Sequence, residues 1–117
     1  MHNFKKLDVW IKSIQFVSDI YRLTNTFPSV ERFGLCSQMQ RAAVSVPANI
    51  AEGTEKSSGK EFARFLEISL GSTFELETEL LIAHNLSYID NFTYEDIQNK
   101  ISELQKMING LKSKIQS

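Results

Sequence analysis

The chain has 117 residues, of which 42% are hydrophobic and 23% charged, and its formal net charge is −1. This length supports one hydrophobic core, and the nearly neutral total provides no overall attraction to nucleic acid or to an anionic membrane. The single cysteine excludes an internal disulfide, and no apolar run reaches the roughly 18 residues that a membrane-spanning helix needs. The opening residues have no apolar signal core, so we expect one cytoplasmic domain over residues 1–117 and no membrane partner.

The first predicted helix runs from Leu7 to about Thr24 and carries two apolar stripes. Spacings of four, three and four place the members of one stripe on a single face: Trp10, Ile14, Val17 and Tyr21. A neighbouring face carries the second stripe: Val9, Phe16, Ile20 and Leu23. One stripe is enough for packing within a small bundle, and a second stripe left in water would form a large exposed apolar patch. We therefore assign the second stripe to a contact with another subunit.

The second predicted helix runs from Glu31 to about Glu52, and we expect Gly53 to end it in a left-handed conformation. Pro47, in its middle, removes a backbone donor and crowds an earlier carbonyl, which predicts a kink at a cost of about 3 kcal/mol unless packing favours the bend. A narrow polar stripe runs along one face of this helix. Its members are Gln38, Arg41, Ser45, Asn49 and Glu52. We expect Ser45 and Asn49 to satisfy the loosened backbone, and the stripe to lie in a subunit contact or, alternatively, in solvent.

The third predicted helix starts at Ser58, where Glu61 three residues later completes a capping-box pattern, and it ends near Leu86. It again has two apolar stripes, about 120 degrees apart. We assign the first to the core: Phe62, Phe65, Leu66, Leu76 and Leu80. We assign the second to a subunit contact: Ala63, Leu70, Phe74 and Leu81. The alternative is that wide stripes reflect tight packing inside a single bundle.

The fourth predicted helix starts at Thr93, where Asp96 repeats the cap pattern, and carries one apolar seam with alternating spacings of four and three. The seam consists of Ile97, Ile101, Leu104, Ile108, Leu111 and Ile115. Short connections between four such helices predict an all-α fold, an up-down-up-down antiparallel four-helix bundle.

None of the residue patterns predicts an enzyme. The segment from Gly53 to Lys60 has five residues between its glycines and follows a helix, unlike a phosphate-binding loop. Neither histidine follows a glutamate by three residues, as a di-iron bundle requires. Cys36 and His84 lie on separate helices with no orienting group. Glu75 and Glu79 share a face with Ser72, which predicts a polar cluster that Glu52 approaches. We expect no catalytic residue, no metal site and no cofactor.

The stretch QMQRAAVSVPANIAEG, residues 38–53, resembles the signature of the S23 family, four-helix bundles encoded in intervening sequences of bacterial 23S ribosomal RNA genes. The flanks FKKLDVWIKS, FPSVERFGL and KEFARFLEISLGSTFELETELLIA agree with it, so the resemblance covers nearly the whole chain. The resemblance implies a ring-like homopentamer. It also implies kinship with the accessory variability protein of diversity-generating retroelements, a basic pentameric barrel that associates with a reverse transcriptase and nucleic acid. The sequence pI of about 6.1 departs from that basic relative.

The predicted topology separates charge along the bundle. Seven cations meet at one end: Lys5, Lys6, Lys56, Lys60, Arg64, Lys112 and Lys114. Four acids meet them there, Asp8, Glu52, Glu55 and Glu61, and seven minus four leaves a net of +3. The other end has Arg22 and Arg32 against Asp19, Glu31, Asp90, Glu95 and Asp96, and two minus five gives −3.

Two functional classes follow from these observations. One is a non-enzymatic homo-oligomeric module, pentameric by the resemblance, that binds RNA, DNA or a nucleoprotein partner through the basic end. The other is a protein interaction scaffold without affinity for nucleic acid, in which the lysines are ordinary solvated helix-end residues.

Overall fold

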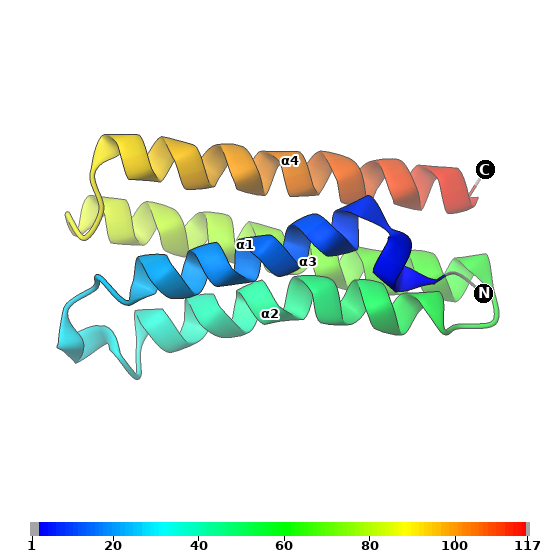
Figure 1. The fold of residues 1–117 in the computed structure, drawn as a ribbon, viewed down its shortest axis with the longest axis horizontal. Coiled ribbons are helices and arrows are strands. Elements are labelled where there is room, and N and C mark those ends of the chain that lie inside the picture. The colour runs from blue at the N-terminus through cyan, green and yellow to red at the C-terminus, as the bar shows by residue number, and fades with distance from the viewer. Residues whose placement is uncertain (1–2, 117) are drawn as a thin grey trace.

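The computed structural model describes residues 3–116, which form four long helices and two short 3-10 helices. The long helices are α1 (Asp8–Thr24), α2 (Leu35–Thr54), α3 (Gly59–Asn85) and α4 (Asn91–Gln116), and the short ones are η1 (Phe4–Lys6) and η2 (Ser29–Glu31). The long helices alternate in direction, and both chain ends lie at the end of the bundle where α2 connects to α3 (Figure 1). No strand occurs within residues 3–116, and the predicted all-α, up-down-up-down bundle is confirmed.

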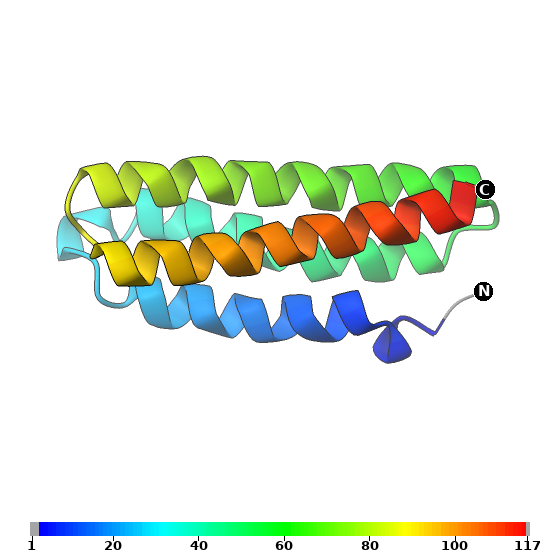
Figure 2. The same cartoon turned by 90° about the horizontal axis from the view of Figure 1, so that it is seen from above.

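Apolar side chains from all four long helices pack into one core. Its fully buried members include Ile20, Met39, Val46, Ile50, Leu66, Leu76, Leu80, Ile101, Leu104 and Ile108. The predicted seam of α4 is confirmed, because its first four members are buried and the last two pack against the core while partly exposed. Seen from above, α4 lies between α1 and α3 (Figure 2).

The stripe of α1 that faces the core is the one assigned to a subunit contact. Val9, Phe16, Ile20 and Leu23 are no more than 8% exposed, whereas Ile14 and Tyr21 of the other stripe are 42% and 46% exposed. Two small polar residues also lie on the core face, and each satisfies its hydroxyl within α1. Ser13 donates to the carbonyl of Trp10 at 2.8 Å, and Thr24 donates to that of Ile20 at 2.9 Å. These short side chains let α1 lie close to its neighbours on this face. Helical spacing alone did not indicate which of the two stripes faces the core.

Gly53 does not end α2, which continues to Thr54, and no described glycine has a positive φ. A Cβ atom at Gly53 would lie 2.9 Å from a ring carbon of Phe62 and 3.0 Å from the Cβ of Phe65. The prediction of a left-handed cap is therefore wrong. Glycine is needed here because α2 and α3 approach each other closely beside two phenylalanine side chains.

Side-chain caps mark the starts of α3 and α4. The Ser58 hydroxyl accepts a hydrogen bond from the backbone N–H of Glu61 at 3.1 Å, so the hydroxyl half of the predicted capping box is confirmed. The α4 helix begins at Asn91, two residues before the predicted start. Its cap is Asp90, whose carboxylate accepts from the N–H of Thr93 at 2.8 Å, a bond that lowers the pKa of Asp90.

The predicted start of the second helix is also displaced, because Glu31 belongs to η2 and α2 begins only at Leu35. The Glu31 carboxylate accepts hydrogen bonds from the N–H of Leu35 at 3.1 Å and from the Tyr88 hydroxyl at 2.8 Å. One side chain therefore caps α2 and ties the α1–α2 connection to the α3–α4 connection. The same hydrogen bond raises the pKa of Tyr88.

Candidate functional surfaces

The middle residues of the polar stripe of α2, Ser45 and Asn49, lie at or beside the contact between α2 and α3. The Ser72 hydroxyl of α3 donates to the Ser45 hydroxyl at 2.8 Å. The Asn49 amide donates to the carbonyl of Ser45 at 2.8 Å and to its hydroxyl at 2.9 Å, and Ser69 donates to the carbonyl of Val46 at 2.9 Å. Backbone carbonyls just before Pro47 thus receive side-chain donors, and α2 continues through the proline. Asn49 donates to the helix backbone, but at Ser45 and not at the Ala43 carbonyl, the one that Pro47 leaves without its helical donor, and the Ser45 hydroxyl accepts instead of donating to the backbone. The predicted compensation is therefore not confirmed, and the contribution of Ser69 was not predicted.

The outer members of the stripe remain at the surface. Gln38, Arg41 and Glu52 are exposed, while Ser45 and Asn49 are half-buried, and Ser45 is bonded to Ser72 of α3 in the same chain. The stripe is therefore partly an internal seam, and only its exposed members remain available to a neighbouring subunit.

A buried carboxyl group lies on the same side of α3. Glu79 is only 5% exposed, and its Oε1 atom has no hydrogen-bond partner among the described residues. Burial, together with the negative charge and the hydrogen bond of exposed Glu75, raises the pKa of Glu79 to about 7. Ser45 lies opposite Ser72 in antiparallel helices, so Glu52 is level with the start of α3. The predicted approach of Glu52 to this cluster is therefore wrong.

The seven predicted cations do lie at one end of the bundle, where the start of α1, the α2–α3 connection and the end of α4 meet (Figure 1). We call this the basic end. Lys60 and Arg64 are exposed, as are Lys5, Lys6 and Lys114. The Lys56 ammonium is half-buried, 4.9 Å from the centroid of the Phe65 ring, and the Lys112 ammonium is 3.9 Å from the Glu67 carboxylate. Glu67 was absent from the sequence count, and seven cations minus five acids leave a net of +2.

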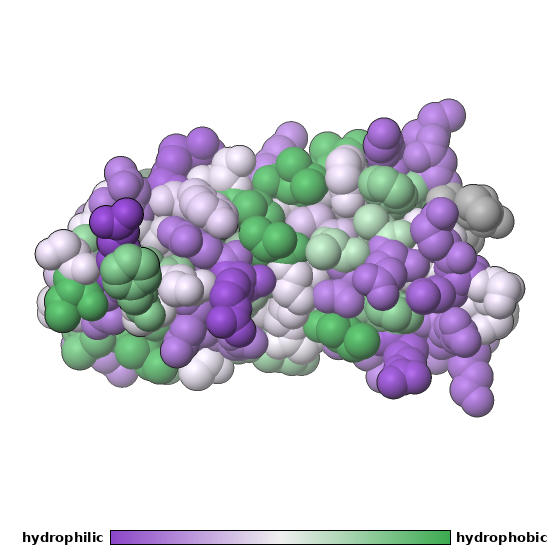
Figure 3. Space-filling view, turned by 90° about the horizontal axis from the view of Figure 1, so that it is seen from below, coloured by the Kyte–Doolittle hydropathy of each residue, from purple (hydrophilic) through white to green (hydrophobic). Residues whose placement is uncertain are grey.

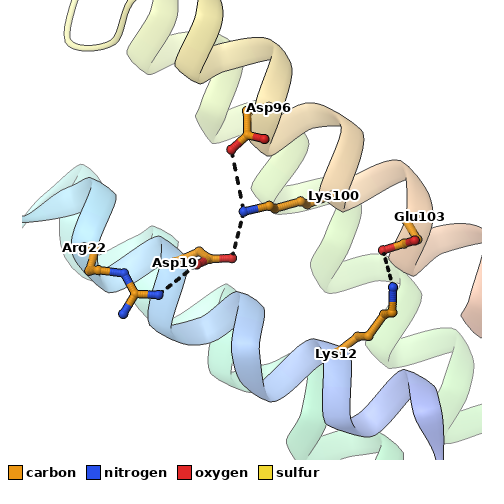
Figure 4. Close-up of polar contacts among 6 residues, drawn as sticks. All are labelled: Lys12, Asp19, Arg22, Asp96, Lys100 and Glu103. Atoms are coloured by element: carbon orange, nitrogen blue, oxygen red, sulfur yellow. Dashed lines mark hydrogen bonds and ion pairs between the residues drawn. The ribbon is translucent and has the colours of Figure 1, made fainter.

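The opposite end is less negative than the sequence count indicated. Lys100 of α4 lies 3.2 Å from Asp19 of α1 and 3.6 Å from Asp96, while Arg22 lies 2.9 Å from Asp19 (Figure 4). The hydrogen bond to Asp19 raises the pKa of Lys100. Including Lys100, three cations against five acids give −2. A second ion pair between α1 and α4 joins Lys12 to Glu103 at 3.1 Å, so charged side chains connect these two helices at the surface, outside the apolar core that both share (Figure 4).

Large apolar side chains remain exposed on all four long helices, and most of them lie on α1 and α3. We call Ile11, Ile14 and Tyr21 the α1 surface, and Ile68, Phe74, Leu81 and Ile82 the α3 surface; their exposed fractions lie between 39% and 52%. Hydrophobic residues are visible along the middle of the face in Figure 3 and at its left end, while hydrophilic residues dominate near the chain ends.

This burial pattern divides the predicted subunit contacts. Val9, Phe16, Ile20, Leu23 and Ala63 are buried in the core of their own subunit and are not available to a partner. Leu70 packs against the core while partly exposed. Phe74 and Leu81 are exposed, as the prediction requires, and Ile14, Tyr21, Ile68 and Ile82 are exposed as well, although none of them was among the predicted contacts. Polarity did not identify Ile14 and Tyr21, because the two stripes of α1 are both apolar, and Ile68 and Ile82 belong to neither stripe of α3.

Cys36 and His84 do not form a reactive pair. The Cys36 thiol is buried and donates to the carbonyl of Thr24 at 3.4 Å, and burial raises its pKa, which disfavours the reactive thiolate. The His84 Nε2 atom lies 2.6 Å from the side-chain oxygen of Asn91, and the ring stacks on Tyr94. Within residues 3–116, no group of three histidine, cysteine, aspartate or glutamate side chains is placed to hold a metal ion. No helix in that part of the chain is long and apolar enough to cross a membrane.

These features define an antiparallel four-helix bundle with a charge difference between its ends and exposed apolar surfaces on its sides. The chain belongs to the 23S rRNA-intervening sequence protein family, whose profile matches residues 5–110. A similar solved structure is that of a protein of unknown function from the S23 ribosomal protein family of Bacteroides thetaiotaomicron. It is 28% identical, with a TM-score of 0.80, and the match covers 89% of this chain and 97% of that one. The comparison with curated proteins gives no match. The predicted family membership is confirmed.

Proposed function

We propose that this chain is a non-enzymatic subunit of a homopentameric ring that binds RNA or DNA through its basic end. The observation that supports nucleic-acid binding is the gathering of seven cations from separate segments against five acids at that end. In a cyclic ring every subunit points the same way, so one rim would repeat the excess of positive charge five times. Such a rim attracts phosphates at low salt although the chain as a whole is nearly neutral.

The family to which the chain belongs also supports binding to nucleic acid. Its name refers to sequences that interrupt 23S ribosomal RNA genes, and the solved relative is assigned to a ribosomal protein family. A cytoplasmic location, where ribosomal RNA is abundant, is part of the proposal. The five-fold state comes from the S23 resemblance, and the link to retroelement accessory proteins remains a prediction.

The surface chemistry supports ring assembly. The α1 surface and the α3 surface differ in composition and lie on different helices, and each exposes apolar groups that a monomer would leave in water. If the α1 surface of one subunit contacts the α3 surface of the next, the contact is heterologous. Heterologous contacts generate closed rings when the rotation between subunits closes.

The nucleic-acid proposal is tested by fluorescence anisotropy with a fluorescein-labelled RNA hairpin. We expect binding at about 50 mM salt that weakens by orders of magnitude at about 200 mM, because phosphate contacts release counterions. The double variant Lys60→Glu and Arg64→Glu should abolish binding, since both side chains are exposed and lie away from the core. Lys56 is less suitable for reversal because its ammonium packs on Phe65.

Arg22→Glu is the matched control, because it reverses an exposed cation at the opposite end. Equal loss of binding in Arg22→Glu and in the double variant would show that the basic end is not the site. An absence of binding by the wild-type chain at the lower salt would favour the scaffold alternative.

A further inference from the structure

An open groove lies at the end of the bundle opposite the basic end, between the last turn of α1 and the start of α2. Its volume is about 820 Å³, and the connection between the two helices forms one side. Phe27, only 8% exposed, is part of its lining, and Tyr21 and Phe33 flank it with exposed fractions of 46% and 88%. A groove of this size with aromatic sides is suited to holding a ligand side chain.

The charges of this groove are of one sign. Arg22 and Arg32 line it, and no aspartate or glutamate belongs to its described lining. The Arg22 side chain is 72% exposed and uses one nitrogen for its ion pair with Asp19, which leaves other donors free. The Arg32 guanidinium lies 5.4 Å from the centroid of the Phe33 ring and makes no ion pair with a described residue. Two guanidinium groups therefore border an aromatic surface.

The exposure of the α1–α2 connection is not explained by packing within the subunit. Val30 and Phe33 are 82% and 88% exposed, while Glu31 between them is held by its bonds to Leu35 and Tyr88. The hydrogen bonds of Glu31 fix the backbone that carries Val30 and Phe33. An ordered segment therefore exposes these two apolar side chains to solvent. Aromatic residues and arginine are the types that dominate protein interface hot spots.

We propose that this groove docks an acidic, apolar segment of a partner protein. One apolar side chain of the segment would enter between Tyr21 and Phe33, and neighbouring carboxylates would pair with Arg22 and Arg32. Arginine forks match carboxylates in two parallel hydrogen bonds, which gives such a contact directional specificity.

The surroundings favour a peptide over a nucleic acid. Three cations against five acids leave this end at −2. A phosphate backbone that extended past the two arginines would meet that negative surface, whereas a segment with one or two carboxylates ends within the groove. The site lies at the opposite end from the proposed RNA contact, so it is independent of that proposal.

The test is selection of a random peptide library displayed on phage against the full chain, followed by anisotropy of the enriched peptides labelled with fluorescein. We expect enriched sequences that combine aspartate or glutamate with leucine or an aromatic residue. Phe33→Ser should weaken their binding by about 30-fold, the size expected of an interface hot spot. Arg32→Glu should weaken it at least as much, because the reversed charge repels the carboxylates.

Phe92→Ser is the matched control, since Phe92 is 82% exposed at the same end and lies outside the groove. Circular dichroism would verify that each variant folds, as expected for such exposed positions. Enrichment of basic peptides, unchanged binding in Phe33→Ser, or equal loss in Phe92→Ser would overturn the proposal. So would displacement of the peptide by single-stranded oligonucleotide, or a change of mass in light scattering caused by Phe33→Ser alone, which would assign the groove to nucleic acid or to a second copy.

Discussion

The buried carboxyl group of Glu79 predicts that the stability of this protein falls as the pH rises. Its pKa is raised from about 4.5 to about 7, first by burial and then by the charge of Glu75. Below the lower value the group is protonated in both the folded and the unfolded chain and has no effect. Between the two values the unfolded chain releases the proton that the folded chain retains, so the free energy of unfolding decreases with pH. Above pH 7 the penalty is constant.

The size of the effect follows from the difference between the two pKa values. A shift from 4.5 to about 7 corresponds to about 3 kcal/mol of lost stability above pH 7. Glu79→Gln keeps the shape of the side chain and removes its charge. We expect this variant to be more stable than the wild type by up to about 3 kcal/mol at about pH 8, and to differ little at about pH 4.5.

Urea unfolding followed by circular dichroism at fixed protein concentration measures this difference across the pH range. Glu75→Gln provides a second check, because removing the neighbouring charge should lower the pKa of Glu79 and move the loss of stability to lower pH. A wild-type stability that is flat or rises between about pH 4.5 and about pH 7 would refute the reasoning. A pH slope that persists unchanged in Glu79→Gln would show that another group causes it.

Three further predictions concern packing, capping and assembly. Gly53→Ala should cost about 1–3 kcal/mol in urea unfolding because its new methyl group would lie 2.9 Å from a phenylalanine ring. Gly110→Ala, with nothing within 4 Å, should instead add about 0.5–1 kcal/mol. Tyr88→Phe removes the 2.8 Å hydrogen bond to the carboxylate that caps α2 and should lower the thermal midpoint, with a loss of about 1.5 kcal/mol. Phe74→Asp should dissociate the proposed ring in light scattering by placing a carboxylate in an apolar contact, whereas Phe92→Asp should not; an intact ring in Phe74→Asp would refute the assigned surface.

The helices and their order could be derived from the sequence because the signals are local. The seam of α4 follows from the spacing of its apolar residues, and every member lies in or against the core. The Ser58 cap follows from a hydroxyl and a glutamate three residues apart. The basic end follows from helix order alone, since an up-down bundle brings alternate helix ends together. Each inference needs only residues that are close in the chain, or the direction of a whole helix.

The choice between two apolar stripes of α1 was decided only by tertiary structure, because both have helical spacing and only the positions of the neighbouring helices distinguish them. The same holds for the role of Gly53, which depends on the distance between α2 and α3 beside Phe62. Glu67 and Lys100 changed the charge of the two ends because their partners lie on other helices. The arginine-lined groove joins α1 to the start of α2 across a turn whose shape depends on the bond between Glu31 and Tyr88. Side chains far apart in the sequence meet only after the helices pack. The periodicity of residues within one helix carries no information about how closely that helix approaches its neighbours.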